Sequence, residues 1–306
     1  KKEVIDKLSN TELRYIDKSQ SSYSDTYFSL ASMMLLDYHQ KPGSPKFSYR
    51  SAFYPEIMYS MQNEIPLISY LKKANSSFIW AAGKNFDCMP SMSWTCVNSP
   101  HGSLPRNSLN FSFSLNLWNF SLTTPLPKVL QRFFNDIRSM DTIGPFIEYI
   151  DKNGLPKTPF FAYIHHNIPH SPFLVTNDCQ PTNYFSQSFE GYKASYQCAL
   201  KMIQMFMEKI NNIDPEAIVV FQADHGWNRL DLEMTEKEKY QLRGKIFNAI
   251  KAPEICFEKY GLPKTTVNTI RFSLNCAYGF KLPYRKNIHY QTNNELGIVV
   301  ERKLYE

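Results

Sequence analysis

The chain has 306 residues, a length that suits one large α/β domain or two small ones with a sizeable hydrophobic core. Hydrophobic residues make up 43% and charged residues 20%, and no apolar run is long enough for a membrane helix, which excludes a bilayer-spanning segment within these residues. The formal charge of +6 comes from scattered Lys and Arg, not from clustered basic stripes, which excludes the usual signature of nucleic-acid binding.

Apolar runs and helical patterns alternate along the chain. The helical patterns cover residues 26–38, 66–73, 127–140, 143–152, 192–213 and 266–276, and the apolar runs predict strands over residues 77–82, 159–165, 217–222 and 246–250. This alternation predicts an α/β fold with a mostly parallel central sheet flanked by helices on both faces. Residues 98–125 predict a long surface loop and residues 153–158 a turn, so we expect a single domain over residues 1–306.

The first predicted helix opens with small hydroxyl and acidic residues, Ser24, Asp25 and Thr26. The amino terminus of a helix attracts anions through its dipole and its free N–H groups. Two interpretations remain open: Thr26 is a nucleophile activated by a divalent metal, or Ser24 or Asp25 simply caps the helix.

Histidines cluster where the predicted strand 159–165 ends. His165, His166 and His170 lie within six residues, and Pro169 and Pro172 restrict the loop that carries them. We expect His165 to be buried and hydrogen-bonded, and His170 to project from the loop as the better candidate for the active site. His166 points to the opposite face of the strand and is not a candidate.

The apolar run 217–222 predicts a buried parallel strand, and Asp224, His225 and Gly226 follow it. Ligands of α/β proteins bind at the carboxyl ends of such strands, and a carboxylate beside an imidazole suits Zn²⁺ or Mn²⁺. Gly226 would let the backbone turn tightly so that Asp224 and His225 converge on one ion. The alternative is an ordinary loop in which the acid caps a segment and the histidine is solvated.

The six cysteines form three closely spaced couples, and their spacing favours disulfides of an oxidising compartment over zinc sites or free thiols. In a bacterium this compartment would be the periplasm or the outer surface. The couples are Cys88 with Cys96, Cys179 with Cys198, and Cys256 with Cys276.

Three of these segments, taken in chain order, resemble a known family. Thr26 followed by Ser-Leu-Ala-Ser, then His-x-Pro-Phe at His170, then Gln-x-Asp-His-Gly at Asp224 resemble the sulfatase-like branch of the alkaline phosphatase superfamily. That branch includes membrane-anchored phosphoethanolamine and phosphoglycerol transferases. The similarity continues in residues 196–199, 244–249 and 266–272, and so covers most of the chain from Thr26 onward.

The resemblance implies a role for each matching residue. Thr26 would be the nucleophile and a metal-bound hydroxyl, and Asp224 and His225 would be metal ligands, for Zn²⁺ first and Mn²⁺ second. His170 would contact the transferred phosphoryl group or a second metal, and His165 would accompany it in the substrate site.

One part of the family's pattern has no match. The family's first strand ends in an acidic metal ligand, but Glu3 and Asp6 are the only early acids and neither ends an apolar strand. Because the chain starts at Lys1 with no Met or signal-like segment, we expect the first strand and a membrane anchor to lie upstream.

The loop after residues 77–82 carries a segment that looks like another family motif. Cys88-Met-Pro-Ser-Met is similar to the sulfatase signature whose cysteine becomes formylglycine, but it lacks the Arg and does not open the first catalytic helix. We therefore favour a Cys88–Cys96 disulfide. Asp87 and Trp94 in this loop are candidates for substrate contact, with a purely structural role as the alternative.

These observations predict a metal-dependent enzyme at the extracytoplasmic face of a bacterial membrane. It would transfer a phosphoethanolamine or phosphoglycerol group from a phospholipid donor to a glycan or lipid acceptor of the cell envelope, through a phosphothreonine intermediate. One alternative is a hydrolase of phosphate or sulfate esters. A third interpretation, of another class, is a catalytically inactive glycan-binding domain.

Overall fold

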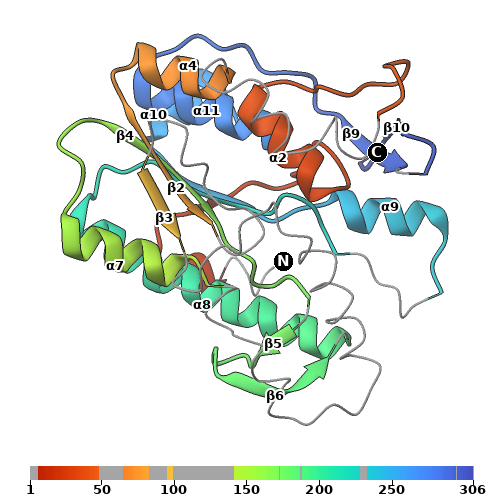
Figure 1. Cartoon of the computed structure of the whole chain (residues 1–306), viewed down its shortest axis with the longest axis horizontal. Helices are drawn as coiled ribbons and strands as arrows, with labels where there is room; N and C mark the ends of the chain where they lie inside the picture. The colour runs from red at the N-terminus through yellow and green to blue at the C-terminus, as the bar shows by residue number, and fades with distance from the viewer. Residues whose placement is uncertain are drawn as a thin grey trace, which may run out of the picture. The chain divides into compact units, whose positions relative to one another are not determined.

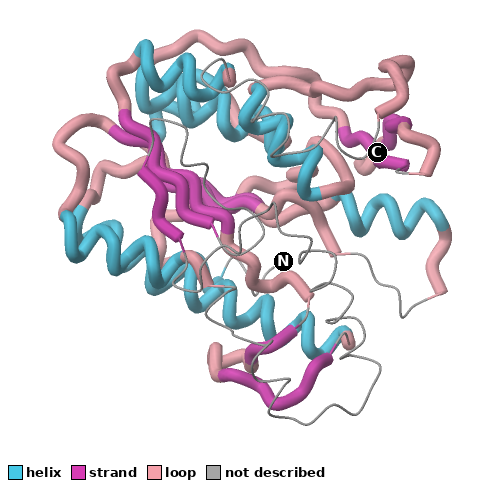
Figure 2. Tube along the Cα trace, in the orientation of Figure 1, coloured by secondary structure: helices cyan, strands magenta, loops and turns pink. Residues whose placement is uncertain are grey.

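The computed structural model describes residues 6–47, 65–82, 95–98, 141–171, 173–186, 188–227, 233–293 and 295–305 (Figures 1 and 2). Its residues group into two compact units, Lys1–Asn75 with Met207–Glu306, and Ser76–Phe206. The single domain expected over residues 1–306 stays a prediction, because two compact units can belong to one domain.

The first unit contains a three-stranded sheet in the order β1-β8-β7. The strands are β1 (Arg14–Tyr15), β7 (Val219–Gln222) and β8 (Asn248–Lys251), and β8 pairs with both neighbours in the antiparallel direction. The parallel, fully buried strand predicted at residues 217–222 was therefore wrong in direction among the described pairings, and β7 is only half-buried. An unbroken apolar run indicates cover on both faces, but it carries no information about the direction of the neighbouring strand.

Helices and a hairpin complete the first unit. The helices are α2 (Thr26–Leu35), α4 (Pro66–Lys73), α9 (Glu236–Gly244), α10 (Glu254–Tyr260) and α11 (Thr266–Tyr278), and β9 (His289–Asn293) pairs with β10 (Ile298–Arg302). Figure 1 shows α2 beside α4 and α11, and these helices are in contact. An aromatic cluster that includes Tyr23, Phe28 and Tyr290 ties α2 to the hairpin.

The helix α2 ends three residues before its predicted end at Tyr38. Leu36 adopts a left-handed conformation at φ 56°, and its N–H donates to carbonyls of the last turn, which closes the helix. The predicted helices at 66–73 and 266–276 are confirmed as α4 and α11.

The second unit contains the parallel sheet that the alternation of elements predicted. Its strands β2 (Ser77–Ala82), β3 (Thr95–Asn98) and β4 (Phe160–His165) lie in the order β3-β2-β4, all parallel, and α7 (Ile143–Asn153) packs against β2 and β3. The short strands β5 (Phe173–Val175) and β6 (Pro181–Ser186) form an antiparallel pair, and α8 (Phe189–Ile213) begins in this unit. The α/β fold class is therefore confirmed, while the predicted helix 127–140 lies outside the described residues.

Two of the expected disulfides are present, Cys179–Cys198 and Cys256–Cys276. Cys96 is also disulfide-bonded, and Cys88, its expected partner, lies outside the described residues. Both bonds fit an oxidising compartment. In the part of the chain that the structure describes, no helix combines the length and the apolar character needed to cross a membrane.

Candidate active site

Thr26 lies at the first position of α2, immediately after the residue that caps the helix. The cap is Asp25, whose backbone is extended and whose Oδ1 accepts the Tyr27 N–H at 3.0 Å. Since Asp25 performs the capping, the hydroxyl of Thr26 is available for another partner. The capping interpretation is therefore confirmed for Asp25, and the role of Thr26 as a nucleophile stays a prediction.

The partner of Thr26 is His225. The His225 Nδ1 lies 2.8 Å from the Gly226 carbonyl oxygen, which can only accept, so Nδ1 carries the proton and Nε2 is an acceptor. The Thr26 hydroxyl donates to this Nε2 over 2.8 Å. The site thus holds a hydroxyl within hydrogen-bond distance of a base, and the base is oriented by a third group.

Asp224 is the third predicted ligand at this position. Its Oδ1 accepts the His225 backbone N–H at 2.9 Å, and its Oδ2 lies 3.6 Å from His225 Nε2. The side chains of Asp224 and His225 are 23% and 10% exposed. Thr26, Asp224 and His225 therefore come together from two segments about two hundred residues apart, within the first unit.

The donor atoms of these residues fit a divalent cation. In a tetrahedral site with metal–ligand bonds of about 2.1 Å, neighbouring donor atoms lie about 3.4 Å apart. The distances of 2.8 Å and 3.6 Å from His225 Nε2 to the two oxygens bracket this value. The Nδ1–H bond to a carbonyl is the orientation that metal-binding histidines adopt.

A complete ligand set is not assembled in the described part of the chain. Among these residues no group of three or more His, Cys, Asp or Glu is placed to hold a metal ion. Of the early acids, Asp6 is exposed and Glu3 lies outside the described residues.

Sequence reasoning missed Arg243, which lies beside these residues. Burial raises the pKa of the Asp25 carboxyl, although the Tyr27 N–H and the charge of Arg243 oppose the shift. Burial likewise lowers the pKa of the Arg243 guanidinium, while Asp224 and Asp25 oppose the shift. The site is therefore a desolvated region in which acidic and basic groups compensate one another.

Arg243 was missed because its helix, α9, was missed. The sequence of α9, EKEKYQLRG, has no apolar period, so the pattern of buried positions gives no signal. A signal does precede it: Thr235 and Glu238 form a capping box in which each side chain bonds to the other's backbone N–H. A Thr-x-x-Glu pattern typically marks the start of a helix.

Gly226 is needed for a reason other than the expected tight turn. A Cβ at this position would lie 2.0 Å from the Leu242 carbonyl oxygen and 2.7 Å from that of Lys245. The Gly226 N–H also donates to the Arg243 carbonyl at 2.7 Å. The Asp-His-Gly segment therefore packs directly on the last turn of α9, so closely that no side chain fits.

A second buried histidine lies near this turn. His289 in β9 donates from Nδ1 to the Ser21 carbonyl at 3.0 Å, and its Nε2 is buried without a hydrogen-bond partner. Burial lowers its pKa to about 4, and the charge of Arg243 acts in the same direction. His289 is therefore neutral at neutral pH.

The predicted histidine loop belongs to the second unit. His165 is half-buried, less than expected, and its Nδ1 lies 3.1 Å from the Tyr163 hydroxyl. His170 is exposed, as expected, and its Nδ1 bonds to the Ser171 carbonyl. Ile168 anchors the loop, because its side chain is buried and packs against Cys198.

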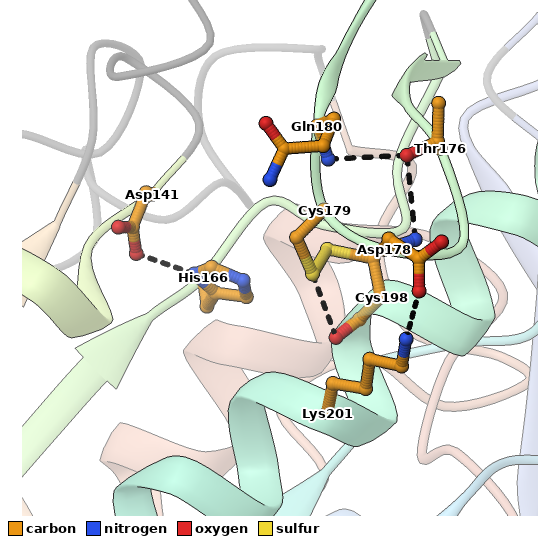
Figure 3. The surroundings of a disulfide bond; sticks show 8 residues. All are labelled: Asp141, His166, Thr176, Asp178, Cys179, Gln180, Cys198 and Lys201. Atoms are coloured by element: carbon orange, nitrogen blue, oxygen red, sulfur yellow. Dashed lines mark hydrogen bonds and ion pairs between the residues drawn. A yellow bond between two sulfur atoms is a disulfide. The ribbon is translucent and has the colours of Figure 1, made fainter.

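His166, which is not a predicted site residue, contacts the start of α7. Figure 3 shows it beside Asp141, near the Cys179–Cys198 disulfide. Its Nδ1 accepts the Thr142 N–H at 3.3 Å and lies 3.7 Å from Asp141 Oδ1. Burial lowers the pKa of His166 to about 4, and the charge of Asp141 only partly opposes this.

The two remaining candidates for substrate contact cannot be placed. Asp87 and Trp94 lie outside the described residues, as does Cys88.

The fold and the site define an α/β protein in which a threonine hydroxyl, a histidine and a carboxylate lie together at the start of a helix. Comparison with protein families makes this specific, because the model of the sulfatase family matches residues 7–252. The chain belongs to the sulfatase family, and with it to the enzymes of the alkaline phosphatase superfamily that act on phosphate or sulfate esters. Enzymes of this superfamily are metal-dependent.

Two solved structures are similar to this chain at low sequence identity. Ps i-CgsB has a TM-score of 0.48 at 14% identity, with 92% of this chain and 67% of that chain covered. The phosphonate monoester hydrolase of Agrobacterium radiobacter has a TM-score of 0.45 at 9% identity, with 95% of this chain and 75% of that chain covered. No curated protein matches the sequence significantly.

Proposed function

We propose that this chain transfers a phosphoethanolamine or phosphoglycerol group from a phospholipid donor to a hydroxyl of a glycan or lipid in the bacterial cell envelope. Thr26 is the nucleophile in this proposal. The observation that carries it is the 2.8 Å hydrogen bond from the Thr26 hydroxyl to His225 Nε2 at the amino terminus of α2. The proposal places the chain at the periplasmic or other extracytoplasmic face of the membrane, which the disulfides support.

In the first step, the Thr26 Oγ1 bonds to the donor phosphorus, and the bond from phosphorus to the diacylglycerol oxygen breaks. The Thr26 proton leaves toward this departing oxygen, so that diacylglycerol is released with its hydroxyl restored. In the second step, the acceptor hydroxyl oxygen bonds to the same phosphorus, the bond from phosphorus to Thr26 Oγ1 breaks, and the acceptor's proton passes to Thr26 Oγ1. The helix dipole of α2 favours negative charge where the phosphoryl oxygens would lie.

The chain's residues orient these groups. Thr26, Asp224 and His225 would hold a divalent cation, Zn²⁺ in preference to Mn²⁺ because a mixed oxygen and imidazole set suits it. Such an ion supplies charge neutralisation and makes the bound hydroxyl more acidic. His165 and His170 stay predicted substrate-site residues, on the family resemblance alone.

The family match favours a second candidate, hydrolysis of a phosphate or sulfate ester with water as the acceptor. A threonine is better suited to phosphorus than to sulfate. Sulfatases release sulfate from a formylglycine. A group bound as an ester to threonine is released only by a second nucleophilic attack on its phosphorus or sulfur atom. We therefore rank transfer of a phospho-substituent first.

The test uses vesicles that contain fluorescent phosphatidylethanolamine or phosphatidylglycerol, incubated with the chain and Zn²⁺. We expect release of diacylglycerol and a mass increase on the peptide that carries Thr26, and Thr26→Ala should abolish both. Ser32→Ala is the matched control, since Ser32 is a buried hydroxyl of the same helix that bonds to the Ser29 carbonyl at 2.7 Å. Full activity of Thr26→Ala would refute the assignment, and turnover of soluble esters without any lipid reaction would favour the hydrolase. Absence of both reactions would favour the inactive glycan-binding domain.

A further inference from the structure

Arg243 connects the two segments that carry the reactive pair. Its Nε donates to the Ser24 carbonyl at 2.6 Å, two residues before Thr26. Its Nη1 donates to the Gly226 carbonyl at 3.1 Å, one residue after His225. One side chain thus bonds to the backbone beside the nucleophile and to the backbone beside its histidine.

These contacts close a ring of hydrogen bonds. The Gly226 carbonyl accepts from both Arg243 Nη1 and His225 Nδ1, His225 Nε2 accepts from Thr26, and the chain returns through Asp25 to the Ser24 carbonyl that Arg243 also binds. A carbonyl oxygen has two lone pairs, so Gly226 can accept both bonds at once. Moving either segment would therefore break a bond elsewhere in the ring.

The chemistry of the ring requires an arginine at this position. A guanidinium presents several donors in a rigid plane, so it can bind two carbonyls from different segments, whereas a lysine ammonium is a single point of charge. The cation also lies close enough to Asp25 and Asp224 for their charges to act on it, which offsets the cost of its burial.

We propose that Arg243 is a positioning residue: it fixes the distance between Thr26 and His225 and holds His225 with its proton on Nδ1. The expected loss of turnover in Arg243 variants rests on the proposed function. The expected change in the geometry of His225 does not depend on that function.

The kinetic test compares Arg243→Met and Arg243→Lys with the wild-type chain in the vesicle assay. We expect kcat to fall about a hundredfold in Arg243→Met, since a misplacement of about 1 Å can cost this much. KM should change little, because in this role Arg243 acts on the reacting pair and not on the substrate. Arg243→Lys should recover part of the loss, since it keeps the charge but not the second carbonyl bond.

Arg271→Met is the matched control. Arg271 is also a buried arginine bound to backbone carbonyls, with bonds to Leu36 at 2.8 Å and to Pro283 at 2.7 Å. It is 4% exposed. Its Leu36 bond lies at the far end of α2, ten residues after Thr26, and neither bond reaches the backbone next to Thr26 or His225. A loss of stability common to any buried arginine would appear in both variants, whereas a loss of kcat should appear only at Arg243.

A second measurement needs no substrate. In the whole chain labelled with ¹⁵N-histidine, the Nδ1–H signal of His225, assigned by its absence in His225→Gln, exchanges with water at a measurable rate. We expect this exchange to be about fivefold faster in Arg243→Met than in the wild type or in Arg271→Met, the effect of losing about one hydrogen bond. If Arg243→Met does not fold, the same comparison is made with Arg243→Lys.

The outcomes separate the two proposals. Faster exchange without any detectable lipid reaction would support the positioning role and refute the proposed function. Unchanged exchange would overturn the positioning role whatever the activity. A raised KM with an unchanged kcat would also overturn it, because it would assign Arg243 to substrate binding.

Discussion

Gly226→Ala should damage the active site without touching any predicted reactive group. The added Cβ would lie 2.0 Å from the Leu242 carbonyl oxygen and 3.2 Å from that of Arg243. Cβ atoms in proteins do not come closer than 3.0 Å to a heavy atom of a residue that is not their neighbour in the chain, so the first of these distances is impossible. The segment that carries His225 must therefore move away from α9 by about 1 Å. This movement would break the two hydrogen bonds between Gly226 and Arg243.

The expected cost follows from these contacts. Overpacking costs about 1 to 3 kcal/mol, and the two lost hydrogen bonds cost about 1 kcal/mol each, which together amount to about 3 to 5 kcal/mol. For a chain of 306 residues, this corresponds to a Tm lowered by about 5 to 8 °C. A movement of about 1 Å would also stretch the Thr26–His225 bond from 2.8 Å to beyond hydrogen-bond length, so turnover should fall about a hundredfold.

The assay measures Tm by circular dichroism and turnover well below the variant's Tm. Gly43→Ala is the control, because Gly43 has φ +86° and no atom within 4 Å of an added Cβ. It should cost only the left-handed backbone strain, about 1 to 2 kcal/mol, and leave turnover unchanged. If Gly226→Ala is as stable and as active as the wild type, the close packing on α9 is wrong.

Three further predictions concern pH, disulfides and metal. The pKa of His289 is about 4 in the folded chain and about 6.5 when unfolded, so the unfolded state binds more protons between these values. Stability should therefore fall by about 3 kcal/mol as the pH drops from 7 to 4, and urea titrations of His289→Leu should show a smaller drop. The bonds Cys179–Cys198 and Cys256–Cys276 span 19 and 20 residues, so replacing either pair by serine should cost a similar amount, about 3 kcal/mol, in urea titrations. Treatment with a chelator should remove turnover and Zn²⁺ should restore it, whereas activity that persists after metal analysis shows complete removal would contradict the metal site.

Much of the site could be predicted because its residues follow a local pattern. Thr26 begins a helix with small and apolar residues, and Asp224 and His225 follow an apolar strand, so both positions are visible within ten residues of sequence. The direction of β7 was not visible in this way, because strand pairing depends on a partner, β8, that lies beyond the next helix. The two loop candidates Asp87 and Trp94 stay predictions.

Arg243 shows why the rest of the site was hidden. It contributes to the site through contacts with main-chain carbonyls of Ser24 and Gly226, and main-chain atoms leave no trace in residue types. Its helix is mostly polar and its two apolar residues, Tyr240 and Leu242, show no helical period, so burial patterns do not detect it either. A buried cation of this kind is found only once the fold brings distant segments together.

The last turn of α9 is fixed on two sides, and this makes it a rigid support for Arg243. On one side the backbone of Gly226 leaves no room for a Cβ. On the other, a Cβ at Gly244 would lie 2.3 Å from Leu304 Cδ1 and 3.1 Å from His289 Cδ2. The two contacts differ in kind, because Gly226 meets backbone carbonyls whereas Gly244 meets the flexible end of the Leu304 side chain. A methyl group at Gly244 can be accommodated by rotation of Leu304, so Gly244→Ala should disturb Arg243 less than Gly226→Ala does.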